Sequence, residues 1–333
     1  MKSMLRHVFQ MAGRLAWVTL MFASLPALGA LVYDAQYPIY DEGKVAHPVS
    51  DIQQMLVEAN AAGVPVIIYV HGRGDEPEKS FNPKMTGGNA MPRLAAEYGA
   101  RVILIGWNSR ARGEDRSQPL SHIVEAAATL RNALEQIITY EHQVPGGKRP
   151  SLLVHSMGSI ALAKMVQQQG WPQEQQPIFS NILISEPDAD SQNHSQWLSQ
   201  ISSHEPVYVT QNRNDSVLDK SRNSRDPPSN FALGLEPTPP YADGAIYVDL
   251  TDALKTKRVV LFKLGAHQVF SKSWMGGNTD TCLFVSKALG VESFDLGSID
   301  GMERVAADHY RAQPMVDQGS PCFRVVGTGG DTE

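Results

Sequence analysis

The chain has 333 residues, of which 42% are apolar and 19% are charged, a composition typical of a globular protein rather than a disordered or fibrous one. The formal net charge of −6 argues against nucleic acid or an anionic membrane surface as a partner. The length suits one large α/β domain, or less readily two smaller ones, with a sizeable buried core.

The first 30 residues have the pattern of an export signal. Three basic residues precede an uncharged, mostly apolar run: Lys2, Arg6 and Arg14 stand ahead of residues 15–28. Ala27-Leu28-Gly29 has the small residues of a signal peptidase site, so we predict a signal peptide over residues 1–29 and a periplasmic or secreted chain over residues 30–333. A single N-terminal membrane anchor is the alternative, because no charge stands between Arg14 and Asp34. After cleavage we expect no stable membrane span.

Strands and helices are predicted to alternate along the rest of the chain. Short apolar runs rich in β-branched residues indicate strands that are buried on both faces of a parallel sheet; they cover residues 64–70, 101–107, 152–154, 178–184, 206–210 and 258–264. Helical patterns cover residues 49–62, 91–98, 121–142 and 160–166. The predicted fold class is therefore α/β, a doubly wound, mainly parallel sheet with helices on both faces. Residues 219–243 are predicted to form a long surface loop, either a functional one such as a lid or a disordered one.

The sequence His155-Ser156-Met157-Gly158 stands where one predicted strand passes directly into a helix. A serine at such a turn has its hydroxyl lifted out at the carboxyl end of the sheet, the arrangement called a nucleophile elbow, with the pattern G-x-S-x-G. Gly158 supplies the second glycine of that pattern. Val154 stands where the pattern requires a small residue, so the elbow either opens slightly to admit a β-branched side chain or has a compromised geometry.

Two later residues supply the partners that a serine nucleophile needs. A hydroxyl is a weak nucleophile unless a base takes its proton, and the base needs a third group to hold its tautomer. Asp215 and His267 each come just after a predicted strand. The chain order serine, acid, histidine predicts a catalytic triad of Ser156, Asp215 and His267.

The acidic cluster Glu186-Pro187-Asp188-Ala189-Asp190 follows the strand that precedes the strand of Asp215. Glu186 or Asp188 could therefore be the triad acid instead of Asp215. Paired carboxylates could also indicate a metal site, but no nearby histidine has the spacing of a zinc ligand. We expect these carboxylates to cap the next helix and to shape the wall of the pocket, and we expect no metal and no cofactor.

The turn His71-Gly72-Arg73-Gly74, after the first clear strand, completes the predicted site. A tight turn at that point can direct backbone amides at a developing oxyanion. We assign the oxyanion hole to the amides of Met157 and Arg73, with Gly72 as the alternative to Arg73.

The two cysteines, Cys282 and Cys322, lie in a predicted C-terminal extension that begins at about residue 271. Export would place both in an oxidising compartment, where they could form a disulfide. The alternative is a pair of free thiols.

Taken together, these segments resemble the α/β-hydrolase superfamily, and more narrowly a bacterial branch of hydrolase-like proteins of unknown function. The likeness covers about residues 63–270 and rests on five segments: residues 70–74, 153–158, 184–190, 212–215 and 265–270. The resemblance implies Ser156 as nucleophile, Asp215 as acid and His267 as base. It implies no particular substrate.

The function expected from these residues is that of an exported serine hydrolase that acts on a carboxylic ester through an acyl-enzyme, with lipase, thioesterase and amidase activities as variants. Its partner would be a small acyl substrate. The alternative is a non-catalytic protein of the same fold that binds a ligand or a protein partner, because function depends on the site and not on the fold. Val154 keeps that alternative open.

Overall fold

The computed structural model describes residues 37–74, 90–110, 116–222, 225, 230–254, 267–270, 279–293, 295–299 and 301–313, with only the backbone of residues 90 and 279–282. All of these residues belong to one unit, Ala35–Glu333. Three sequence predictions fall outside them: the signal peptide over residues 1–29, the strand over residues 258–264, and the pairing of Cys282 with Cys322.

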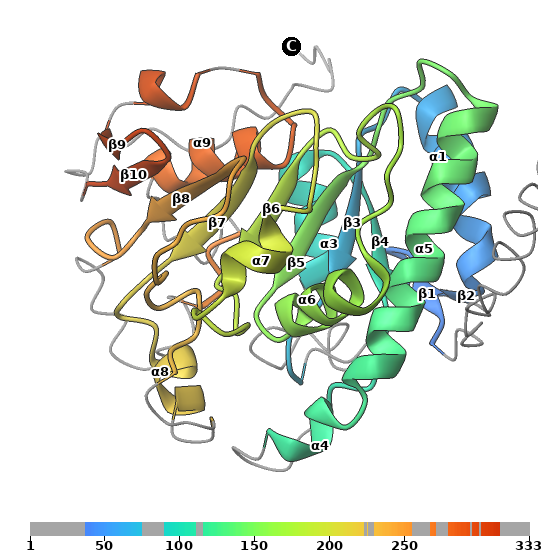
Figure 1. Ribbon diagram of the computed structural model, residues 1–333. Coiled ribbons are helices and arrows are strands. Elements are labelled where there is room, and N and C mark those ends of the chain that lie inside the picture. The colour runs from blue at the N-terminus through green and yellow to red at the C-terminus, as the bar shows by residue number, and fades with distance from the viewer. Residues whose placement is uncertain are drawn as a thin grey trace, which may run out of the picture. The chain divides into compact units, whose positions relative to one another are not determined.

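The described strands form one sheet of ten (Figure 1). Their order across the sheet is β2 (Ala46–His47), β1 (Ile39–Tyr40), β4 (Arg101–Ile105), β3 (Val66–Val70), β5 (Ser151–His155), β6 (Ile182–Ser185), β7 (Val207–Gln211), β8 (Ala245–Asp249), β10 (His309–Ala312) and β9 (Met302–Ala306). The strands from β4 across to β10 are parallel, and antiparallel pairs occur only towards the two edges of this described sheet. The predicted α/β fold with a mainly parallel sheet is confirmed.

Alternate residues of the central strands point to opposite faces of the sheet, and helices cover both faces. In β3, Ile68 and Val70 belong to one apolar core, and Ile67 and Tyr69 belong to the other. The first core holds the apolar sides of α1 (Ile52–Ala61), α5 (Ile123–Gln143), α6 (Gly158–Gln169) and α7 (His194–Leu198). The second core holds those of α3 (Ala90–Tyr98) and α9 (Thr279–Ala288).

The chain reverses its direction of travel across the sheet at β3. After β3 it moves outward to β4, then returns through α5 to place β5 on the other side of β3. In open α/β sheets, ligand sites form beyond the carboxyl ends of the strands at such a switch point. The turn after β3 and the turn after β5, which carry the predicted site residues, therefore lie side by side.

Several elements differ from the sequence prediction. Strand β6 begins at Ile182 rather than at the predicted residue 178. The buried Ile178 and Phe179 lie before it in irregular structure. Strand β8 was not predicted, although the apolar run after Gly244 is its signal. The segment after residue 271 supplies α9 to one face of the sheet and β9 and β10 to its edge.

The described parts of residues 219–243 do not form the long surface loop that the sequence predicts. The helix α8 (Ser216–Arg222) occupies their start, and Ala232, Leu233 and Leu235 are buried. Ala232 also forms a β-bridge with Asp190. Leu233 belongs to the first apolar core, whereas Ala232 and Leu235 form a small separate cluster with Leu218 of α8. These few apolar residues are hard to recognise in a segment that is mostly polar. The remaining described helical turns are short: α4 (Ser117–Leu120), η1 (Val49–Asp51) and η3 (Leu296–Ser298).

Candidate active site

The elbow is formed as the sequence predicts, with Ser156 between the end of β5 and the start of α6. Ser156 has a φ of +51°, in the left-handed region that few residues other than glycine adopt. Its amide donates to the carbonyl of Ser185 at 3.1 Å, and its carbonyl accepts from the amides of Asp188 and Ser159, both at 3.0 Å. These bonds hold the strained residue in place, as strained backbone at functional sites requires.

Two glycines permit the close packing around Ser156. A Cβ on Gly158 would lie 2.8 Å from the carbonyl oxygens of both Val70 and His71, and a Cβ on Gly72 would lie 2.8 Å from the Cβ of Ser156. Because glycine has no side chain, the turn after β3 can pack directly against the elbow at these two positions.

Val154, the departure from the elbow pattern, is fully buried and belongs to the first apolar core. In the sheet it pairs with Val70 on one side and Ile184 on the other. The β-branched side chain is accommodated in the core, and the tight contacts of the elbow fall at Gly158 and Gly72 instead. At this elbow Ser156 has a positive φ and lies within hydrogen-bond distance of His267.

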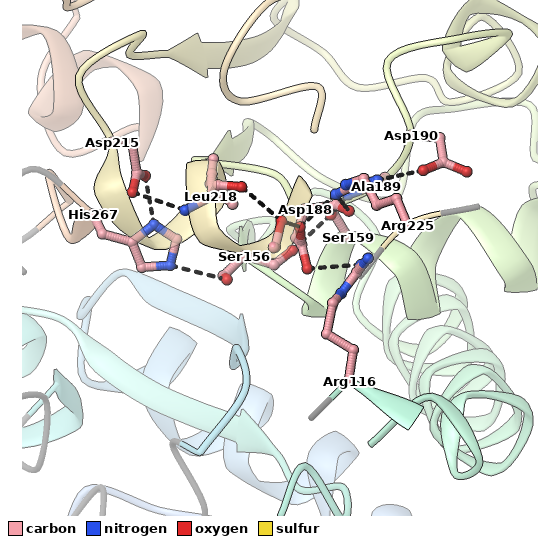
Figure 2. Close-up of polar contacts among 11 residues, drawn as sticks. Arg116, Ser156, Ser159, Asp188, Ala189, Asp190, Asp215, Leu218, Arg225 and His267 are labelled. Atoms are coloured by element: carbon pink, nitrogen blue, oxygen red, sulfur yellow. Dashed lines mark hydrogen bonds and ion pairs between the residues drawn. The ribbon is translucent and has the colours of Figure 1, made fainter. Parts of the chain in front are cut away.

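Ser156, His267 and Asp215 lie in one hydrogen-bonded line (Figure 2). The distance from Ser156 Oγ to His267 Nε2 is 3.0 Å, and the distance from His267 Nδ1 to Asp215 Oδ2 is 2.5 Å. All three side chains are buried, Asp215 completely. The structure thus brings together the three residues of the predicted triad.

The bonds of Asp215 determine which nitrogen of His267 carries the proton. Asp215 Oδ1 accepts from the amides of Val217 and Leu218 at 2.8 and 3.1 Å, so the carboxylate also holds the first turn of α8. An ionised carboxylate can only accept, so His267 Nδ1 must donate to Oδ2. Nε2 is then the acceptor that faces the Ser156 hydroxyl, which is the protonation state that a general base requires.

The predicted oxyanion donors lie beside Ser156. Arg73 and Met157 line the same cavity as Ser156, with a volume of about 210 Å³. Met157 stands just before the first residue of α6, and its amide donates to no carbonyl in the described part of the chain. An amide at that position is available to a substrate oxygen.

His71 fixes the turn that carries Gly72 and Arg73. The Trp107 amide donates to His71 Nε2 at 3.3 Å, so the proton of His71 lies on Nδ1, which donates to the Gly72 carbonyl at 2.9 Å. The Trp107 indole donates to the His71 carbonyl at 2.9 Å and its ring stacks on the imidazole. The Gly74 amide bonds Ser109 Oγ at 3.1 Å. These contacts tie the turn to Trp107 and Ser109, which follow β4.

Asp215, and not Glu186 or Asp188, holds His267. The Glu186 carboxylate accepts from the hydroxyls of Ser185 and Thr210 at 2.5 and 2.9 Å. Burial raises the pKa of Glu186 from 4.5 to about 7, although His155 and the hydrogen bond from Ser185 oppose this. Asp188 lines the cavity, as expected of a pocket-wall residue. Neither carboxylate caps the next helix: α7 begins after Asn193 and has no side-chain cap.

Residues 50–226 match a protein family described as an alpha/beta hydrolase of unknown function (DUF900), and this match covers more than half of the chain. The chain belongs to this α/β-hydrolase family. No curated protein matches the sequence. The matched part of this α/β hydrolase contains the elbow and Asp215, and His267 follows it.

Several residues that shape the site of this α/β hydrolase were not predicted from the sequence. His155 Nε2 donates to the His267 carbonyl at 2.7 Å, and its ring packs edge-on against Phe270, 4.9 Å between centroids. Tyr98 donates its hydroxyl to the Phe270 carbonyl at 2.8 Å. The residue before the nucleophile therefore anchors the loop of the histidine. Arg116 and Arg225, which bind Asp188, were also missed, since no local pattern connects them to it.

The described part of the chain contains no cluster of His, Cys, Asp or Glu suited to hold a metal ion. Among the helices that the structure describes, none is long and apolar enough to cross a membrane.

Proposed function

We propose that this α/β hydrolase is a serine hydrolase that cleaves a carboxylic ester through an acyl-enzyme. The observation that carries the proposal is the line from Ser156 to His267 to Asp215, at an elbow whose serine has a positive φ. An isolated serine or histidine has many structural roles, whereas this order of donors and acceptors is the one that activates a hydroxyl. Thioesters and amides would follow the same chemistry.

In the proposed reaction, Ser156 Oγ attacks the acyl carbonyl while its proton passes to His267 Nε2. Asp215 stabilises the imidazolium through Nδ1–H. The amides of Met157 and Arg73 would donate hydrogen bonds to the carbonyl oxygen as it becomes negatively charged, and removal of one such donor typically lowers the rate by about 10²–10³-fold. The alcohol leaves with the proton from His267. Water, activated by the same nitrogen, then releases the acid and restores Ser156.

The proposal is tested with residues 30–333 and two short p-nitrophenyl esters, the acetate and the butyrate. We expect hydrolysis by the wild type and a loss of about 10³-fold or more in kcat for Ser156→Ala. Ser50→Ala, a substitution of an exposed serine far along the chain from the elbow, is the matched control and should retain wild-type activity. A wild type that hydrolyses neither ester faster than Ser156→Ala would favour a binding role for the fold.

We also propose that the chain is exported, because residues 1–29 have a basic start, an apolar run and a small-residue end. Expression of the full chain in a Gram-negative bacterium should yield a periplasmic or secreted protein whose N-terminus is Ala30. Mass spectrometry of the purified product measures this directly. A product that retains Met1 and remains with the membrane fraction would instead support an N-terminal anchor.

A further inference from the structure

Two buried arginines meet one buried carboxylate beside the elbow (Figure 2). The Arg116, Asp188 and Arg225 side chains are only 7%, 4% and 2% exposed. Arg116 Nη2 lies 2.9 Å from Asp188 Oδ2, and Arg225 Nη2 lies 2.5 Å from Asp188 Oδ1. Ser221 donates its hydroxyl to the same Oδ1 at 2.8 Å. Both carboxylate oxygens are therefore occupied, by donors from three residues that come from two distant regions of the chain.

A buried cluster of charges contributes little net stability to a fold. Removing charges from water costs several kcal/mol per ion, and buried ion pairs can often be replaced by apolar residues without loss of stability. Burial lowers the pKa of the Arg116 guanidinium, an effect that Asp188 opposes. A buried cluster with this cost calls for a role besides stability.

The main chain of Asp188 connects the cluster to the nucleophile. The Asp188 amide donates to the Ser156 carbonyl at 3.0 Å. The next amide, of Ala189, donates to Ser159 Oγ at 2.9 Å, and that hydroxyl donates to the same Ser156 carbonyl at 2.6 Å. Two successive amides thus fix the carbonyl of the strained Ser156.

Arg225 binds the main chain of Asp188 as well as its carboxylate. Its Nη2 donates to the Asp188 carbonyl at 2.7 Å, and its Nη1 bonds the more exposed Asp190 carboxylate. Among the residues that the structure describes, Arg116 bonds only the Asp188 carboxylate. Arg225 therefore constrains the Asp188 peptide units directly, and Arg116 constrains them through the side chain.

We propose that Arg116, Asp188 and Arg225 form a clamp that positions the backbone of Ser156 for attack. The inference rests on the proposed function, because it assigns the clamp an effect on the reactivity of the Ser156 hydroxyl. The two arginines are positioning residues: they act through Asp188 and its amide, and neither lines the cavity described beside Ser156. Loss of the clamp lets φ of Ser156 relax and moves Oγ away from His267 Nε2.

The test measures the reactivity of Ser156 separately from the amount of folded protein. Residues 30–333 are treated with a fluorophosphonate probe, and two quantities are recorded: the fraction labelled at saturation and the rate constant of labelling. For Arg116→Gln and Arg225→Gln we expect labelling rates and kcat to fall by roughly 10–100-fold, because small displacements of reacting groups have effects of that size. KM and the saturating fraction should stay within about twofold of wild type.

Arg131→Gln is the matched control, because Arg131 also bonds a carboxylate, that of Glu135, and a main-chain carbonyl, that of Gly170, but at the C-terminal end of α6, the end opposite Ser156. It should label at the wild-type rate. Lysine variants serve if the glutamine variants do not fold: Arg116→Lys can restore the single bond to Asp188, whereas Arg225→Lys cannot reach all of its acceptors. We expect near wild-type labelling for the first and slow labelling for the second.

Three results would overturn the clamp. Wild-type labelling rates in both glutamine variants, or in Arg225→Lys, would show that Ser156 does not depend on it. A loss confined to the saturating fraction would mean that the arginines only stabilise the fold, and a rise in KM alone would mean that they contact substrate. If the wild type itself is not labelled, the proposed function fails and the clamp's role in catalysis fails with it, a result distinct from the other three.

Discussion

At the scale of single residues, the backbone of Ser156 is held by its neighbours on every side. Gly72 and Gly158 allow close approach, the Ser185 carbonyl and the Asp188 amide bond its peptide groups, and its side chain faces His267. Most of these partners lie far from Ser156 in the chain. The geometry of the nucleophile is therefore a property of the packed fold rather than of the elbow sequence alone.

Val154→Gly, which restores the common form of the elbow pattern, should destabilise the protein without a gain in activity. Val154 is fully buried, so the variant loses apolar contacts and introduces glycine into a central strand. We expect a loss of about 2–4 kcal/mol in the free energy of unfolding, measured by urea denaturation. A variant that is as stable as the wild type and more active would show that Val154 does obstruct the elbow.

Asp215→Asn should separate the chemical role of Asp215 from its structural one. The amide oxygen can still cap α8 at Val217 and Leu218, but the NH₂ group would then face His267 Nδ1 and impose the wrong tautomer. We expect kcat to fall by about 10³–10⁴-fold with a small change in melting temperature. If activity fell only in proportion to the amount of folded protein, Asp215 would serve only to cap α8.

At the scale of elements, the strands that are easiest to predict from the sequence are those whose own residues are mostly apolar. Strand β3 is a continuous apolar run, and β4 and β7 are apolar over most of their length, as expected of strands that are buried on both faces. Strand β9 escapes prediction because four of its five residues are exposed, and it exists through its pairing with β10. The buried part of residues 230–235 escapes prediction because a few apolar residues stand among many polar ones.

The contact between β3 and α6 depends on Gly158. An alanine there would place its Cβ 2.8 Å from two backbone oxygens, which cannot move aside as a flexible side chain can. We expect Gly158→Ala to cost about 1–3 kcal/mol of stability and to slow ester hydrolysis, because the turn at Gly72 is pushed away from Ser156. Gly297→Ala, where the new Cβ would approach only the Asp295 carboxylate at 3.3 Å, is the control. Unchanged hydrolysis in Gly158→Ala would contradict this account of the elbow.

At the scale of the whole molecule, the sheet places the site at its switch point. Ser156, Asp215 and His267 could be selected from the sequence because each follows a strand or a predicted strand in the expected order. The clamp and the anchor at His155 could not, because ion pairs between residues 72 and 37 positions apart leave no local pattern. Such contacts are determined only when the segments pack.

Glu186 should make the stability of the whole protein depend on pH. Burial raises its pKa from 4.5 to about 7, so between these values the folded protein binds a proton that the unfolded chain releases. The stability from this group is complete below about pH 4.5 and is lost as the pH rises through about 7. Glu186→Gln cannot ionise, so its stability relative to wild type should increase from pH 5 to pH 8 by up to about 3 kcal/mol, measured by urea denaturation. A difference that is constant across this range would contradict the pKa shift.

The most direct test of the central claim is to identify the residue that a probe specific for serine hydrolases modifies. Residues 30–333 are treated with a fluorophosphonate, digested, and examined by peptide mass spectrometry, with Ser156→Ala treated in parallel. The account predicts a single adduct on Ser156 in the wild type and none in Ser156→Ala. The absence of an adduct in folded wild-type protein, or an adduct on another serine, would contradict it.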